Sequence, residues 1–101
     1  MGAVDSQDDR LAYSACGPNS PRPKPDLMAP IPFPSLWRAK LFGGTSAAAP
    51  QGAGLAALLL SRHPNWTAAQ VRMALQTAAH DLGPRGPDWE TGYGLVVLPR
   101  E

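Results

Sequence analysis

The sequence predicts a fold of short strands and two helices, one of which is apolar on nearly every side. Seven of the 12 prolines lie between residues 18 and 34, where they exclude helix and favour extended chain. Residues 46–62 carry only four polar side chains, those of Ser46, Gln51, Ser61 and Arg62. A helix of this composition is typical of the interior of a domain larger than these 101 residues.

The segments before the helices are predicted to be extended. Residues 1–17 are expected to form paired strands, because the apolar runs 2–4 and 11–14 flank a polar turn. The first strand has no further predicted neighbour, so an open strand edge is expected there. Residues 18–45 are predicted to be a proline-rich connecting loop that leads to the glycine pair Gly43 and Gly44.

The first helix is predicted at residues 46–62. Pro50 lies near its start, where a missing N–H group costs least. His63 and Pro64 follow the apolar run and interrupt it. The helix therefore presents Ser46 at its N-terminal end.

The second helix is predicted at residues 67–82. Thr67 is a favourable N-cap residue, and Gln70 three residues later completes a capping box. From Val71 onward apolar residues recur at i, i+3, i+4 and i+7, which indicates one buried face. A Gly/Pro-rich loop then leads to a closing segment at 92–98, expected to be either a short strand or the start of a terminal helix.

The composition excludes several classes of function. The net charge is +1 and the nine basic residues are scattered, so no nucleic-acid partner is expected. The longest apolar run is shorter than the roughly 20 residues of a membrane span, so no membrane partner is expected. The single cysteine, Cys16, rules out an internal disulfide. No residues have the spacing of a metal site, and neither a metal nor another cofactor is expected.

Ser46 is the residue best placed for chemistry. The N-terminus of a helix offers unpaired N–H groups and the positive end of the helix dipole, which stabilise negative charge on a nearby oxygen. A nucleophilic serine that transfers acyl groups needs this setting. The competing interpretation is structural, since Thr45 or Ser46 would also serve as a simple cap of a buried helix.

The motif around this serine is similar to that of a known family. Residues 44–50, Gly-Thr-Ser-Ala-Ala-Ala-Pro, resemble the serine motif Gly-Thr-Ser-x-Ala-x-Pro of the subtilisin-like serine proteases, or subtilases. Residues 24–30 (Lys-Pro-Asp-Leu-Met-Ala-Pro), 63–67 and 92–95 resemble further elements of that family in the same order. The resemblance extends over nearly all of residues 1–101.

This resemblance implies an α/β fold, of which the chain is the C-terminal part, incomplete as a domain. It implies a serine endopeptidase that hydrolyses peptide bonds through an acyl-enzyme on Ser46, whose backbone N–H is one oxyanion donor. The supporting motif residues would be Gly44, Thr45, Ala48 and Pro50. Gln51 departs from the family pattern, which has histidine after the proline.

The other members of the catalytic triad are not found in this sequence. A serine needs a histidine base and an orienting carboxylate, and in this family both precede the serine along the chain. The 45 residues before Ser46 contain no histidine, whereas His63 and His80 follow it and are interpreted as helix-terminal residues. The chain alone is therefore expected to be inactive and to need the N-terminal half of the catalytic domain as its partner.

Several residues have competing interpretations. Asp5 is interpreted as a turn residue, Asp26 as structural, Asp88 as a loop residue, and Asn19 as lying outside the context of an oxyanion donor. The alternative function is a non-catalytic interaction or complementing module derived from a subtilase. A truncated or late-started gene product is a further expectation.

Overall fold

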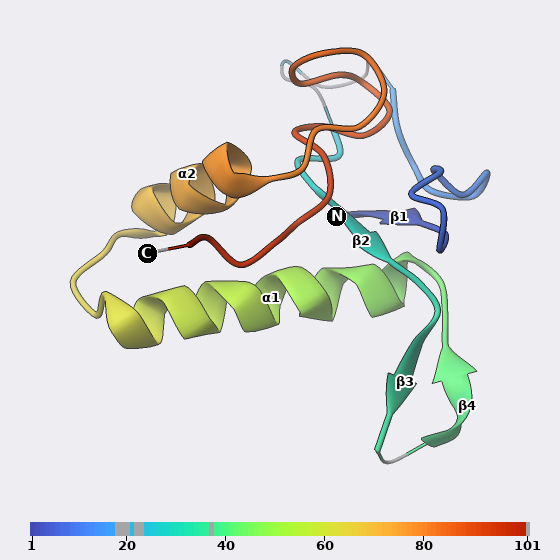
Figure 1. Ribbon diagram of the computed structural model, residues 1–101, viewed down its shortest axis with the longest axis horizontal. Helices are drawn as coiled ribbons and strands as arrows, with labels where there is room; N and C mark the ends of the chain where they lie inside the picture. The colour runs from blue at the N-terminus through green and yellow to red at the C-terminus, as the bar shows by residue number, and fades with distance from the viewer. Residues whose placement is uncertain (18–20, 22–23, 37, 101) are drawn as a thin grey trace.

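The computed structural model describes residues 1–17, 21, 24–36 and 38–100 of the chain. Four short strands precede two helices (Figure 1). In chain order they are β1 (Gly2–Val4), β2 (Met28–Pro30), β3 (Phe33–Ser35), β4 (Arg38–Phe42), α1 (Thr45–Arg62) and α2 (Ala68–Ala78). The first strand and the two helices occur in the order that the sequence predicts, whereas β2, β3 and β4 lie in the segment that was predicted to be a loop.

β1 and β2 form the centre of a small sheet. They pair in parallel, with Gly2 opposite Met28 and Val4 opposite Pro30. On the other side of β2, Met28 forms a parallel bridge with Leu95, and its carbonyl accepts the N–H of Val96 at 2.8 Å. Within the closing segment 92–98, residues 95 and 96 therefore lie beside β2 after a turn at 91–93, which agrees with the strand alternative, and no helix forms there.

The prediction of a second strand at 11–14 is wrong, and so is that of an open edge on β1. Residues 12–14 form a turn, and only Arg10 bridges back to Val4. The N–H of Leu11 donates to the Ala3 carbonyl at 3.0 Å, and the Ala3 N–H donates to the buried Ser14 Oγ at 2.9 Å. This turn satisfies the outer edge of β1 without a strand, because a side-chain oxygen replaces a ladder carbonyl.

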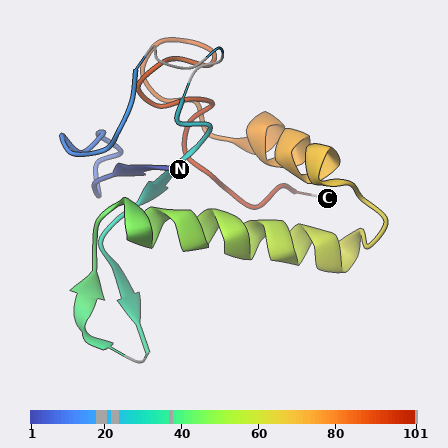
Figure 2. The ribbon, with the colours of Figure 1, turned by 180° about the vertical axis from the view of Figure 1, so that it is seen from behind.

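The prediction of one connecting loop at 18–45 is also wrong. Residues 28–42 hold β2 and the antiparallel hairpin β3–β4, in which Phe33 pairs with Phe42 and Ser35 with Arg38. The hairpin extends away from the rest of the chain (Figures 1 and 2). Proline is compatible with these strands because Pro30 is the last residue of β2 and Pro34 lies in a two-stranded hairpin, in which both strands are edge strands.

α1 packs against β1, β2 and α2, but it leaves much of its apolar surface uncovered. Only Ala47, Ala48 and Leu59 of this helix are buried. Leu58 and Leu60 are 48% and 40% exposed. The core lies where the helices meet the sheet, and it consists of Ala3, Leu27, Ala29, Ile31, Ala47, Ala48, Leu59, Val71, Leu75 and Val96.

α2 begins as predicted and ends earlier. The Thr67 side chain accepts the N–H of Gln70, and the Gln70 side chain accepts the N–H of Thr67, so the capping box is confirmed. The helix stops at Ala78 rather than at residue 82. The reason is non-local, because the backbone of His80 exchanges hydrogen bonds with Leu95 of the closing segment. Neither helix of the described residues has the length and hydropathy needed to cross a membrane.

Candidate active site

Ser46 lies in the first turn of α1, and its side chain is exposed. Neither its hydroxyl nor its backbone N–H hydrogen-bonds to any residue that the structure describes. The N-cap of α1 is Gly44, and no side chain caps the helix. The interpretation of Thr45 or Ser46 as a simple cap therefore does not apply. The backbone N–H and the hydroxyl of Ser46 therefore both lie at the N-terminal, positive end of the helix dipole.

Gly44 provides the backbone conformation that leads into this turn. Its φ is 79° and its ψ is 170°, a region that is essentially restricted to glycine. A Cβ atom at this position would lie 3.9 Å from the backbone nitrogen of Ser46. That is an ordinary contact distance, so the glycine is required for its backbone conformation, which lets the chain enter the helix without strain.

Of the other motif residues, which lie in the first two turns of α1, only Ala48 belongs to the core. Thr45 is its first residue and is partly exposed, whereas Ala48 is completely buried. Pro50 is exposed on the helix surface, and it has no N–H to donate to the Ser46 carbonyl one turn earlier. The small side chain at position 48 lets the helix lie close to the sheet, while Pro50 weakens the helical hydrogen bonding of the first turn.

Gln51 makes a contact that its sequence position did not reveal. Its Nε2 donates to the Pro30 carbonyl at the end of β2, at 2.7 Å, and to the Ala47 carbonyl at 3.1 Å. The sequence marked Gln51 only as a departure from the family pattern. A glutamine next to a helical proline was the only available signal, and its partner in β2 is 21 residues away.

Neither histidine lies beside Ser46. His63 caps the C-terminal end of α1, roughly 25 Å from Ser46 along the helix axis at 1.5 Å per residue. Its ring stacks on Trp66 with 3.9 Å between centroids. His80 is exposed, and its backbone pairs with Leu95 at the far edge of the sheet. The structure therefore does not bring a base to the serine within the described residues.

The acidic residues have structural partners. Asp5 Oδ1 accepts the N–H groups of two residues in its own turn. Asp26 forms ion pairs with Lys24 at 2.7 Å and with Arg72 of α2 at 3.3 Å. Asp88 Oδ1 accepts two N–H groups within its loop. These roles agree with their predicted interpretations, while Asn19 lies outside the described residues.

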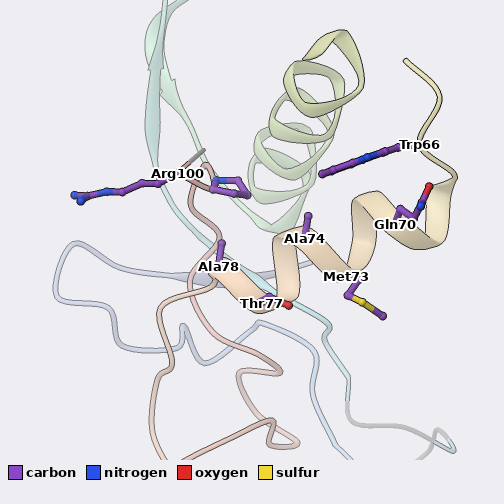
Figure 3. Close-up of a pocket in the computed structure, with 8 residues that line it drawn as sticks. Trp66, Gln70, Met73, Ala74, Thr77, Ala78 and Arg100 are labelled. Atoms are coloured by element: carbon purple, nitrogen blue, oxygen red, sulfur yellow. The ribbon is translucent and has the colours of Figure 1, made fainter. Parts of the chain in front are cut away.

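The described residues contain no group of three or more His, Cys, Asp or Glu side chains that would hold a metal ion. A hollow of about 560 Å³ lies at α2, and the Arg100 side chain beside it extends away from the helix (Figure 3). Its lining residues are Trp66, Gln70, Met73, Ala74, Thr77, Ala78, Pro99 and Arg100. Ser46 is not among them, so this hollow and the serine are separate features.

Comparison with known proteins identifies the family. The sequence model described as "Subtilase family" matches residues 1–94. Subtilisin of Bacillus pumilus is 42% identical over 100 residues, which cover 95% of this chain and 34% of that protein. Subtilisin E of Bacillus subtilis (strain 168) is also 42% identical over 95% of this chain, and the match covers 24% of that protein.

A solved structure agrees with the sequence matches. The psychrophilic subtilisin-like protease of the Antarctic psychrotroph Pseudoalteromonas sp. AS-11 aligns with a TM-score of 0.53 and 46% identity, over 55% of this chain and 13% of that one. The fold is thus a part of the α/β fold of subtilisin-like serine peptidases. The chain belongs to the subtilase family. It spans about a third or less of the length of these curated relatives.

Proposed function

We propose that this chain is the nucleophile-bearing, C-terminal segment of a subtilisin-like serine endopeptidase, and that Ser46 is its nucleophile. The observation that carries the proposal is the exposed Ser46 hydroxyl at the start of α1, beside its own N–H, which has no hydrogen-bond partner among the described residues. Among the motif residues Gly44, Thr45, Ala48 and Pro50, the glycine provides the backbone conformation before the turn and Ala48 lets the helix lie close to the sheet. The match to the subtilase family over residues 1–94 supports the same assignment.

The proposed reaction is hydrolysis of a peptide bond in two steps. Ser46 Oγ attacks the carbonyl carbon and its proton passes to a histidine base, while the Ser46 N–H stabilises the negative oxygen. The amine then leaves with that proton. Water hydrolyses the resulting ester, which releases the acid and restores the hydroxyl.

The base, its carboxylate and the second oxyanion donor come from a complementary segment. No histidine precedes Ser46 in the sequence, and neither later histidine lies beside it. Exposed apolar side chains on different sides of α1, among them Leu58 and Leu60, are available for hydrophobic contact with such a segment. The chain by itself is therefore proposed to be catalytically silent, because an unassisted serine is an ordinary alcohol.

The test is complementation. The chain is mixed with the N-terminal segment of Bacillus pumilus subtilisin, ending before the residue that aligns with Met1. Labelling by a serine-directed phosphonate is then located by mass spectrometry, and peptide hydrolysis is measured in parallel. We expect no label on the chain alone, and label at Ser46 together with hydrolysis in the mixture.

Two variants control the experiment. Ser46→Ala should remove both label and hydrolysis. Ser61→Ala, at the other end of α1, should retain both, since its hydroxyl only donates to the Leu58 carbonyl. Labelling of Ser46 in the chain alone would refute the inference that this chain lacks a base for the serine. Tight association without label or hydrolysis would refute the protease assignment and favour a non-catalytic module.

A further inference from the structure

The first turn of α1 has few of the usual constraints on a helix start. Gly44 provides no capping side chain, and Pro50 provides no N–H for the Ser46 carbonyl. The N–H of Ala47 donates to the Gly44 carbonyl at 2.9 Å. Gly52 follows two residues after the proline and adds backbone freedom. The orientation of Ser46 therefore needs support from outside the helix backbone.

Gln51 provides such a support. Its Nε2 has two hydrogens, and both have acceptors: the Pro30 carbonyl at 2.7 Å and the Ala47 carbonyl at 3.1 Å. Pro30 is the last residue of β2, and Ala47 follows Ser46 directly. One amide thus connects the end of the parallel strand pair with the turn that carries the serine.

The hydrogen bond from Gln51 to Pro30 complements the packing of the first turn of α1 against the sheet. Ala47 and Ala48 are fully buried against the core, so the helix start rests on the sheet on one side. Each of these side chains offers a single methyl group, so their packing is less directional than a hydrogen bond, which needs a defined distance and angle. The hydrogen bond from Gln51 to Pro30 therefore restrains rotation of the first turn about the helix axis.

We propose that Gln51 is a positioning residue for Ser46: it fixes the first turn of α1 against the end of β2 and thereby sets the direction of the Ser46 hydroxyl and N–H. This inference rests on the proposed function of Ser46. Gln51 itself touches neither substrate nor the reacting atoms. A small displacement of a nucleophile lowers the rate because reaction needs close and aligned approach, and about 1 Å costs up to about 100-fold.

The test compares Gln51→Met, which keeps the length and loses both donors, with Gln51→His, which restores a ring N–H donor. Gln76→Met is the matched control, since Gln76 lies on α2 and makes no hydrogen bond to a described residue. In the complemented protease, Gln51→Met should lower kcat at least about 10-fold with KM within about 2-fold. Gln51→His should recover part of kcat, and Gln76→Met should match the parent.

A second measurement does not depend on activity. Hydrogen exchange of residues 43–51 is compared with that of residues 68–78 in the same molecule. The measurement uses the complex with the complementary segment if that complex forms, and the chain alone if it does not. We expect Gln51→Met to accelerate exchange only in 43–51. Unchanged exchange there, or an unchanged kcat in an active parent, would overturn the inference.

The two measurements separate this inference from the proposed function. A parent that neither hydrolyses peptide nor takes label refutes the protease assignment, and the exchange comparison still decides whether Gln51 holds the turn. An active parent whose Gln51→Met variant keeps its kcat refutes the positioning role alone. Gln51→Asn, which keeps the amide but shortens the reach, serves as the second variant where Gln51→Met does not fold.

Discussion

At Gly44 the backbone enters α1 with a φ of 79° and a ψ of 170°, which only glycine adopts without strain. Gly44→Ala is therefore expected to destabilise the fold by about 1–3 kcal/mol. Gly43→Ala is the matched control, because no atom lies within 4 Å of a Cβ there and its φ lies outside the left-handed region. Denaturant unfolding of both variants measures the difference, and equal losses would contradict a special role for Gly44.

Ser46 differs from Gly44 in that its side chain adds little to the fold. Its hydroxyl is exposed and has no hydrogen-bond partner among the described residues. Ser46→Ala should therefore change the free energy of unfolding by less than about 0.5 kcal/mol, as is usual for exposed positions. Thermal unfolding of the variant beside the parent checks this. A loss of several kcal/mol would show that the hydroxyl has a structural partner.

At the scale of the element, α2 has a complete capping box at its N-terminal end. The helix is short, and both hydrogen bonds of the box are formed between Thr67 and Gln70. Thr67→Ala is expected to cost about 1 kcal/mol, because an N–H at the helix start loses its partner. Thr77→Ala, at an exposed site inside the same helix, should be neutral or slightly stabilising. Equal effects of the two changes in unfolding experiments would contradict the cap.

The sheet shows how distant segments set the bounds of an element. α2 ends at Ala78 because His80 pairs with Leu95, and Leu95 in turn pairs with Met28 of β2. Gly92 makes this passage possible, since its φ is +60° and a Cβ would collide with the backbone of Pro25 and Asp26. The closing segment is thus held in the sheet by close backbone contacts rather than by its own propensity.

For the molecule as a whole, the uncovered surface of α1 governs behaviour in solution. Leu58 and Leu60 are exposed on a helix whose composition is that of a domain interior. The double change of Leu58→Gln and Leu60→Gln should weaken binding to the complementary segment by about 10-fold or more, since roughly half of each side chain is available for burial. Titration by fluorescence or calorimetry measures this affinity.

The same double variant should also reduce self-association and apolar dye binding of the isolated chain. Leu36→Gln is the control, because Leu36 is fully exposed between β3 and β4, away from α1. It should leave affinity and dye binding unchanged. Equal weakening by both variants would show that the effect does not arise at α1.

The features that the sequence predicted correctly are those with local causes. The apolar run and Pro50 define α1, and Thr67 and Gln70 define the start of α2, because capping and helical spacing act within a few residues. The position of Ser46 at a helix start follows in the same way. The motif of residues 44–50 also indicated the family to which the chain belongs.

Only the tertiary structure decided which distant segments lie side by side. Residues 28–30 became a central strand within a proline-rich stretch, because β1 and the closing segment supply hydrogen-bond partners on both sides. Residues 12–14 became a turn, because Ser14 Oγ already satisfies the Ala3 N–H. The contact of Gln51 with Pro30 likewise depends on how α1 lies against β2. Such pairings join residues far apart in the chain, and local propensity contains no information about them.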